Sequence, residues 1–203
     1  LGVTVIYENC PMEGWCPASW PFTYNNLPGT LAARKLMYAL IPSKAHGETY
    51  DPSHDIWQNI DPIEVIKLAD PARVHRIHVK GSRNHKSQAR LFWGGLFPMQ
   101  TVDPKLAKKA GVPIPAHDWD RHHYDPMLPG FGGYDSMDWR GFLETLMQLK
   151  YNGPFVIENE GFNSAHTGSL GATVQGFQAT VMCLSATLWP LAGAEGYKFD
   201  TSK

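Results

Sequence analysis

Short apolar runs rich in β-branched residues alternate along this chain with segments of helical periodicity, and this alternation limits the possible folds most strongly. Four strands are predicted, over Val3–Tyr7, Gly47–Tyr50, Val74–Val79 and Phe155–Ile157. Helices are predicted between and after them, over Leu31–Leu40, Pro62–Ala69, Trp139–Lys150 and Ser169–Leu188. Alternation of this kind favours parallel strands joined by right-handed crossovers, so we expect an α/β fold.

The predicted helices have recognisable starts. Thr30 and Asp138 are suitable N-caps, and Asp61-Pro62 combines an N-cap with a proline in the first turn. The segment 82–127 is instead a long irregular insert with one short helix near Pro104–Ala110, and loops of this length are usually functional. The chain has 203 residues, so we expect one domain over 1–203.

The composition argues against several classes of partner. Lys and Arg number 18 against 19 Asp and Glu, which gives no electrostatic reason to expect nucleic acid or an anionic membrane as partner. No apolar run reaches about 18 residues, and no secretory leader opens the sequence. Three cysteines, Cys10, Cys16 and Cys183, do not make a disulfide framework. We therefore expect a cytoplasmic protein.

Residues of types that commonly ligate metals lie at or just past the ends of all four predicted strands. They are Glu8, Asp51, His78 and Glu158. Each has an ordinary alternative explanation, such as a cap, a turn residue, a core histidine or a solvated strand end. Because the carboxyl ends of parallel strands meet at one edge, where sites are built in α/β folds, their joint placement predicts a common site.

Three carboxylates and one imidazole form an oxygen-rich ligand set. Such a set suits Mn²⁺, Mg²⁺ or Co²⁺ better than a structural Zn²⁺, which favours cysteine and histidine. Positions left open on the ion could take adjacent hydroxyl and carbonyl oxygens of a sugar. Polarisation of the carbonyl would then ease removal of the neighbouring C–H proton.

Five motifs, in order along the chain, resemble the xylose-isomerase-like TIM barrels of the sugar phosphate isomerase/epimerase family. They are Ile6–Asn9, Tyr50–His54, Ile77–Lys80, the segment from Leu128-Pro129-Gly130-Phe131-Gly132 through Asp138-Trp139, and Phe155–Glu160. The chain departs from the family at Gly81, where many members have Asp, and in the length of its insert. Strands one to four are also absent.

The resemblance implies a (β/α)8 TIM barrel of which this chain supplies the C-terminal half, strands 5–8. A full barrel takes roughly 250 residues. Three explanations are open: the first half lies outside this sequence, another chain supplies it, or a second copy closes the barrel. We favour the first, and we also expect a homo-oligomer.

The resemblance also implies roles for individual residues. The metal ligands are Glu8, Asp51, His78 and Glu158, with Mn²⁺ as the first choice and Mg²⁺, Co²⁺ or Zn²⁺ as alternatives. Glu8 and Glu158 serve in addition as the catalytic acid and base. The resemblance also implies substrate-binding roles for His54 and Lys80. Two further substrate-binding residues are expected from their own chemistry and position, a sugar-stacking ring at Trp15 and a polar group of the insert at Arg121.

These roles predict a metal-dependent isomerase or epimerase of a sugar or sugar phosphate. The alternative is a metal-dependent lyase on a keto-sugar, resembling inositol dehydratases or C-glycoside deglycosidases. Its extra acid would come from the insert, which carries His117, Asp118, Arg121, His122 and His123. A DNA-repair endonuclease is disfavoured by the balanced charge, and a non-catalytic sugar-binding protein by the presence of all four ligands.

Overall fold

The computed structural model describes residues 2–11, 26–84, 104–112, 124–127, 129 and 135–158, with isolated positions between 174 and 185. Several sequence predictions fall outside these residues. They concern Trp15, Arg121, Glu160, the histidines of the insert and most of the helix expected over Ser169–Leu188.

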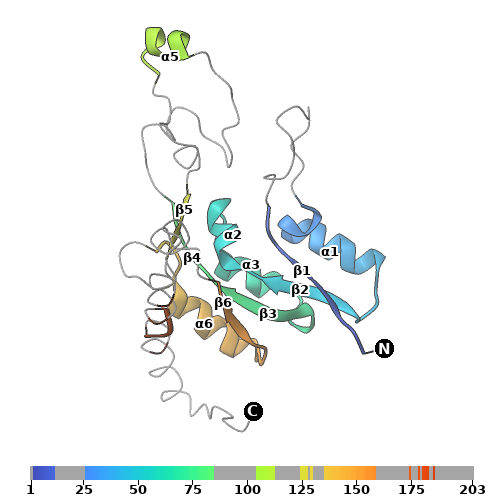
Figure 1. The fold of residues 1–203 in the computed structure, drawn as a ribbon. Helices are drawn as coiled ribbons and strands as arrows, with labels where there is room; N and C mark the ends of the chain where they lie inside the picture. The colour runs from blue at the N-terminus through green and yellow to red at the C-terminus, as the bar shows by residue number, and fades with distance from the viewer. Residues whose placement is uncertain are drawn as a thin grey trace.

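Four parallel strands form the main sheet, side by side in the order β1-β2-β3-β6 (Figure 1). Their bounds are Val5–Glu8 for β1, His46–Tyr50 for β2, Val74–Val79 for β3 and Phe155–Ile157 for β6. The prediction of an α/β fold with parallel strands is confirmed. The first strand begins two residues later than predicted, and it includes Glu8 as its last residue.

The helices follow the strands in the expected alternation. Their bounds are Leu31–Leu40 for α1, Pro52–Trp57 for α2, Pro62–Leu68 for α3, Pro104–Ala110 for α5 and Trp139–Gln148 for α6. Single 3-10 turns, η1 at Leu27–Gly29 and η2 at Pro71–Arg73, precede α1 and β3. All three predicted caps are confirmed, since the side chains of Thr30, Asp61 and Asp138 each accept a hydrogen bond from the first turn of their helix.

Two elements correct the sequence analysis. No helix was predicted directly after Asp51, where a turn was only an alternative, but the segment forms α2, with Asp51 as N-cap and Pro52 in the first turn. The insert also begins and ends in regular structure. Strand β4, Gly81–Asn84, pairs antiparallel with β5, Tyr124–Met127, so the two ends of the insert are held together.

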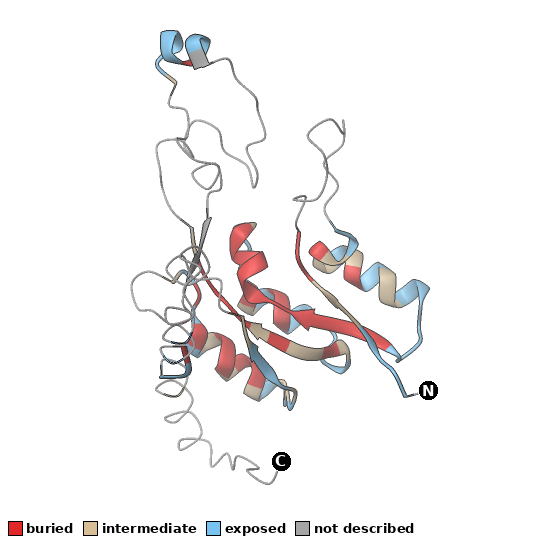
Figure 2. Cartoon of the chain, in the orientation of Figure 1, coloured by how far each residue is buried: buried red, intermediate tan, exposed pale blue. Residues whose placement is uncertain are grey.

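The two faces of the sheet serve different purposes. Side chains alternate between faces along a strand, so Tyr50 and Ile77 lie opposite the site residues that follow them. Both are fully buried in a hydrophobic core that includes Ile66 of α3 and Phe142 of α6. Strand β2 and helix α2 are buried along their whole length (Figure 2). This packing fixes the strand ends that carry the candidate site.

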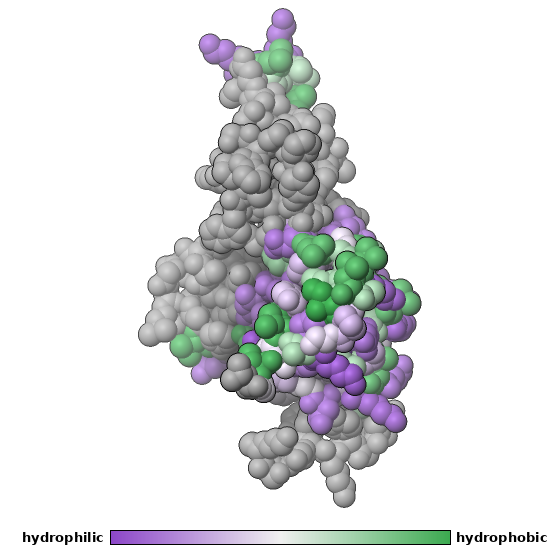
Figure 3. All heavy atoms as spheres, turned by 90° about the vertical axis from the view of Figure 1, so that its right-hand side faces the viewer, coloured by the Kyte–Doolittle hydropathy of each residue, from purple (hydrophilic) through white to green (hydrophobic). Residues whose placement is uncertain are grey.

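Apolar side chains remain exposed near β1, which is one edge of the sheet among the described residues. Val5 of β1 and Leu36 and Leu40 of α1 are examples. Figure 3, which faces this side of the molecule, shows apolar side chains lying among polar ones. None of the described helices has the length and apolar character needed to cross a membrane.

Candidate metal centre

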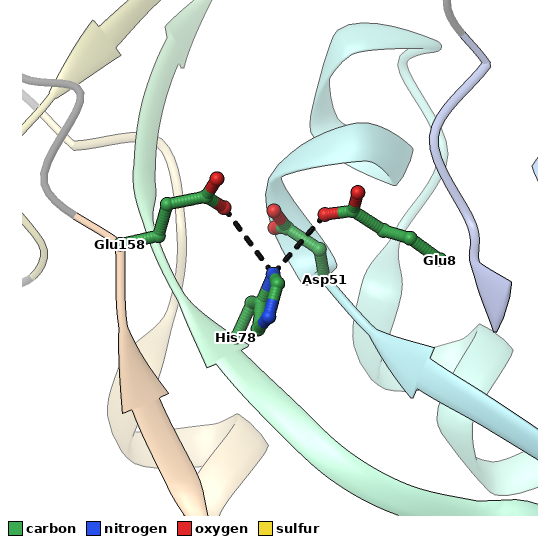
Figure 4. Close-up of side chains that lie close together, drawn as sticks. All are labelled: Glu8, Asp51, His78 and Glu158. Atoms are coloured by element: carbon green, nitrogen blue, oxygen red, sulfur yellow. Dashed lines mark hydrogen bonds and ion pairs between the residues drawn. The ribbon is translucent and has the colours of Figure 1, made fainter. Parts of the chain in front are cut away.

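Four side chains from four strand ends point toward one another at the carboxyl edge of the sheet (Figure 4). Glu8 ends β1, Asp51 follows β2, His78 lies one residue before the end of β3, and Glu158 follows β6. Each offers one ligand atom, and these atoms all lie within 4.8 Å of one another. The structure thus brings together all four of the residues that the sequence singled out as ligands.

Asp51 is held rigidly by the start of α2. Its Oδ1 accepts a hydrogen bond from the backbone N–H of Ser53 at 2.8 Å, which is the N-cap contact. Its Oδ2 lies 3.0 Å from Lys80 Nζ and 3.4 Å from His54 Nε2. One carboxylate oxygen therefore fixes the side chain, which leaves the other directed into the centre.

His78 lies between the two glutamates. Its Nδ1 is 3.1 Å from Glu8 Oε1 and 3.2 Å from Glu158 Oε2. Glu158 is carried to this point by a backbone hydrogen bond from its N–H to the carbonyl of Val79, 3.1 Å long, which extends the pairing of β3 with β6 by one step. The glutamates therefore reach the imidazole from the two outer strands of the sheet.

Hydrogen bonds from cationic neighbours keep the two glutamates ionised. His54 and His78 hold the pKa of Glu8 far below its usual range. The hydrogen bond from His78 lowers the pKa of Glu158 to about 2, and Lys80 contributes to the same shift. In both cases these interactions outweigh partial burial, which would raise the pKa.

The two histidines are shifted in the opposite direction. Hydrogen bonds with Glu158 and Glu8 raise the pKa of His78 to about 9. Burial favours the neutral form of His54, but the charge of Asp51 and hydrogen bonds with Cys10 and Glu8 outweigh it and raise its pKa to about 10. Near neutral pH the three carboxylates thus face cationic side chains.

Trp57 supports the two cations on the buried side of the centre. Its ring contacts the edge of the His54 ring, with centroids 4.2 Å apart, and lies 5.4 Å from Lys80 Nζ. His54, Trp57 and Lys80 are all buried. Trp57 is therefore a packing residue in this centre, and the substrate-binding roles of His54 and Lys80 stay predictions.

The ligand set fits a divalent cation. Two ligands on opposite sides of an ion at about 2.4 Å are about 4.8 Å apart. The four ligand atoms all lie within 4.8 Å of one another, so one ion could contact them together. Oxygen ligands outnumber the single imidazole nitrogen three to one, a composition that suits Mn²⁺ or Mg²⁺. Glu8, Asp51, His78 and Glu158 could therefore hold such an ion together.

Comparison with known proteins decides the family. The model of the family described as xylose isomerase-like TIM barrel matches residues 1–180. The chain belongs to this family. The resemblance read from the motifs is thereby confirmed, as is membership of the TIM barrel fold class.

Solved structures similar to this chain include the xylose isomerase domain protein from Planctomyces limnophilus. The two share 14% sequence identity with a TM-score of 0.46, over 78% of this chain and 43% of the other. The present chain therefore spans less than half of the length of the Planctomyces limnophilus protein. None of the curated proteins matches the sequence of the present chain significantly.

Helix α2, which positions Asp51, was not predicted although the sequence carries its start signal. Asp51-Pro52 carries the same cap and first-turn signal as Asp61-Pro62, which was interpreted correctly as a helix start. The role of Asn9, whose side chain is buried beside Asp51, was not predicted either. Asn9 belongs to the motif Ile6–Asn9, but nothing in that motif indicates its contact with Asp51, because the two residues are 42 positions apart.

The raised pKa of His78 predicts that metal binding releases a proton. Below about pH 9 the imidazole is protonated, whereas a metal ligand must present a free lone pair. Mn²⁺ affinity should therefore rise by about tenfold per pH unit between about pH 6 and 8. Isothermal titration in two buffers of different ionisation enthalpy should detect about one proton released per ion.

The variant His78→Gln provides the control for this prediction. It removes the titrating imidazole, so it should bind Mn²⁺ more weakly and lose most of the proton release. A wild-type affinity that does not change across this pH range would contradict the role of His78.

Proposed function

We propose that the chain forms the metal-binding part of a divalent-metal-dependent isomerase or epimerase of a sugar or sugar phosphate. The observation that carries the proposal is the convergence of three carboxylates and an imidazole from four strand ends in a xylose isomerase-like TIM barrel. A bound divalent ion would polarise the substrate carbonyl and so acidify the neighbouring C–H bond.

Exposure separates the carboxylates by role. Asp51 is fully buried, whereas Glu8 and Glu158 are 35% and 34% exposed. A substrate could reach the two glutamates but not the aspartate. We therefore assign Asp51 to ligation alone, and Glu8 and Glu158 to both ligation and proton transfer.

The two glutamates are also placed to transfer protons on two sides of a bound substrate. They approach His78 from opposite directions in Figure 4. Because their pKa values are lowered, both carboxylates are in the form that accepts a proton. One can remove the proton next to the carbonyl. The other lies on the opposite side of the substrate and would have to take up a proton from solvent before returning it to carbon, so that epimerisation brings a solvent hydrogen into the product.

Each glutamate has one buried cationic partner besides His78. His54 Nε2 lies 3.4 Å from Glu8 Oε1, and Lys80 Nζ lies 3.0 Å from Glu158 Oε2. These contacts orient the carboxylates.

Solvent exchange tests the proposal. The protein, loaded with Mn²⁺, is incubated in D₂O with a panel of aldoses, ketoses and their phosphates, and the recovered sugars are analysed by mass spectrometry. We expect deuterium in a recovered sugar and in its isomer, loss of the exchange with EDTA, and recovery with added Mn²⁺. Product that has lost water would instead indicate the lyase, and absence of exchange and conversion for the whole panel would contradict the proposal.

A further inference from the structure

Asn9 lies directly after Glu8 and contacts the second strand end of the centre. Its side chain is fully buried. Its Nδ2 donates a hydrogen bond to the backbone carbonyl of Asp51 at 2.9 Å, and its Oδ1 accepts one from the backbone N–H of the same residue at 2.7 Å. One side-chain amide thus satisfies both backbone groups of a metal-ligand candidate that is 42 residues away.

This contact replaces the backbone pairing of the two strands where that pairing stops. The parallel register of β1 with β2 ends at Glu8 opposite Thr49. Beyond this pair, β2 is followed by α2 from Asp51 onward, so the strand pairing by backbone hydrogen bonds does not continue there. The amide of Asn9 continues the connection by one step and sets the spacing of Glu8 and Asp51.

Asparagine suits this position for a chemical reason. The contact needs one donor and one acceptor on a short side chain, and among short side chains the amide supplies both in one plane. Aspartate would accept from the N–H of Asp51 but would face its carbonyl without a donor. Alanine would leave two buried backbone groups of Asp51 without the amide.

We propose that Asn9 is a positioning residue of the metal centre, which holds the ligands Glu8 and Asp51 at their mutual spacing through the backbone of Asp51. The inference rests on the proposed function, since it takes these residues as ligands. Outer residues that orient metal ligands typically contribute 10- to 100-fold to metal affinity, roughly the effect expected here.

The test measures Mn²⁺ affinity by calorimetry in the variants Asn9→Ala and Asn9→Asp. Asn9→Asp keeps the side-chain size and the acceptor, so it remains informative if Asn9→Ala does not fold. Ile66→Val is the matched control, because it removes buried volume from the core on α3 without touching the centre. Urea unfolding of all three variants places their losses of stability on one scale.

We expect the dissociation constant to rise by about 10- to 100-fold in both Asn9 variants and to stay unchanged in Ile66→Val. Amide hydrogen exchange should also increase at Asp51 and Ser53 in the Asn9 variants while the rest of β2 stays protected. Wild-type affinity in both Asn9 variants, or an equal loss in the core control, would overturn the inference alone. Failure of the wild-type protein to bind Mn²⁺ would overturn the proposed function and the inference with it.

Discussion

Replacing Glu158 with glutamine should lower the rate of deuterium exchange into the substrate by about 10²–10⁴-fold, the usual contribution of a general base. Glutamine keeps the size of the side chain but removes its charge and basicity. The change also removes an anionic partner of His78 and of Lys80, which lie 3.2 Å and 3.0 Å from Glu158 Oε2. Weaker Mn²⁺ binding should therefore accompany the slower exchange.

Two further variants test whether this effect is specific to Glu158. Glu144→Gln changes an exposed carboxylate on α6 that pairs only with Arg140 in the described contacts, and it should leave exchange at the wild-type rate. The same change at Glu160, which lies outside the described residues, should cost far less than at Glu158. Equal or reversed effects at positions 158 and 160 would show that the fourth ligand has been assigned to the wrong residue.

Replacing Arg34 with methionine should lower the free energy of unfolding by about 3–5 kcal/mol, because it leaves a buried carboxylate without its partner. Arg34 Nε lies 2.7 Å from Glu48 Oε2, and both side chains are 1% exposed. The pair joins α1 to the outer face of β2, two residues before the strand end that carries Asp51. Urea unfolding at pH 8 measures the loss.

The penalty for this variant should depend on pH. Burial already raises the pKa of Glu48 to about 7 although Arg34 opposes the shift, and removal of Arg34 raises it further. A carboxyl group whose folded pKa is raised contributes stability below its unfolded pKa, and that contribution is lost as pH rises through the folded value. The free energy of unfolding of Arg34→Met should therefore be closest to that of wild type near pH 5 and furthest below it above pH 8.

The double variant Arg34→Met with Glu48→Gln is the control. It removes both charges, so it should recover most of the lost stability at pH 8 and show little pH dependence from this site. If the free energy of unfolding of Arg34→Met alone lies within about 1 kcal/mol of the wild-type value at pH 8, the buried pair does not make the expected contribution to stability.

The sequence by itself determined most of the frame on which the candidate centre is built. Strands such as Val74–Val79 are marked by β-branched residues, and helix starts such as Asp138 by a capping side chain, so both depend on near neighbours in the chain. The ligand candidates could also be predicted from the sequence, because parallel strands bring their carboxyl ends to one edge of the sheet. Membership of the barrel family followed from five such short motifs in order.

Tertiary structure decided what depends on distant partners. The pairing of β4 with β5 across the insert, the ion pair of Arg34 with Glu48, and the amide of Asn9 against Asp51 have no local sequence signal. Each exists because the path of the chain brings together groups that burial then obliges to pair. The ligand candidates at the strand ends could thus be predicted from the local sequence. The spacing of Glu8 and Asp51, in contrast, is set by a contact between residues 42 positions apart.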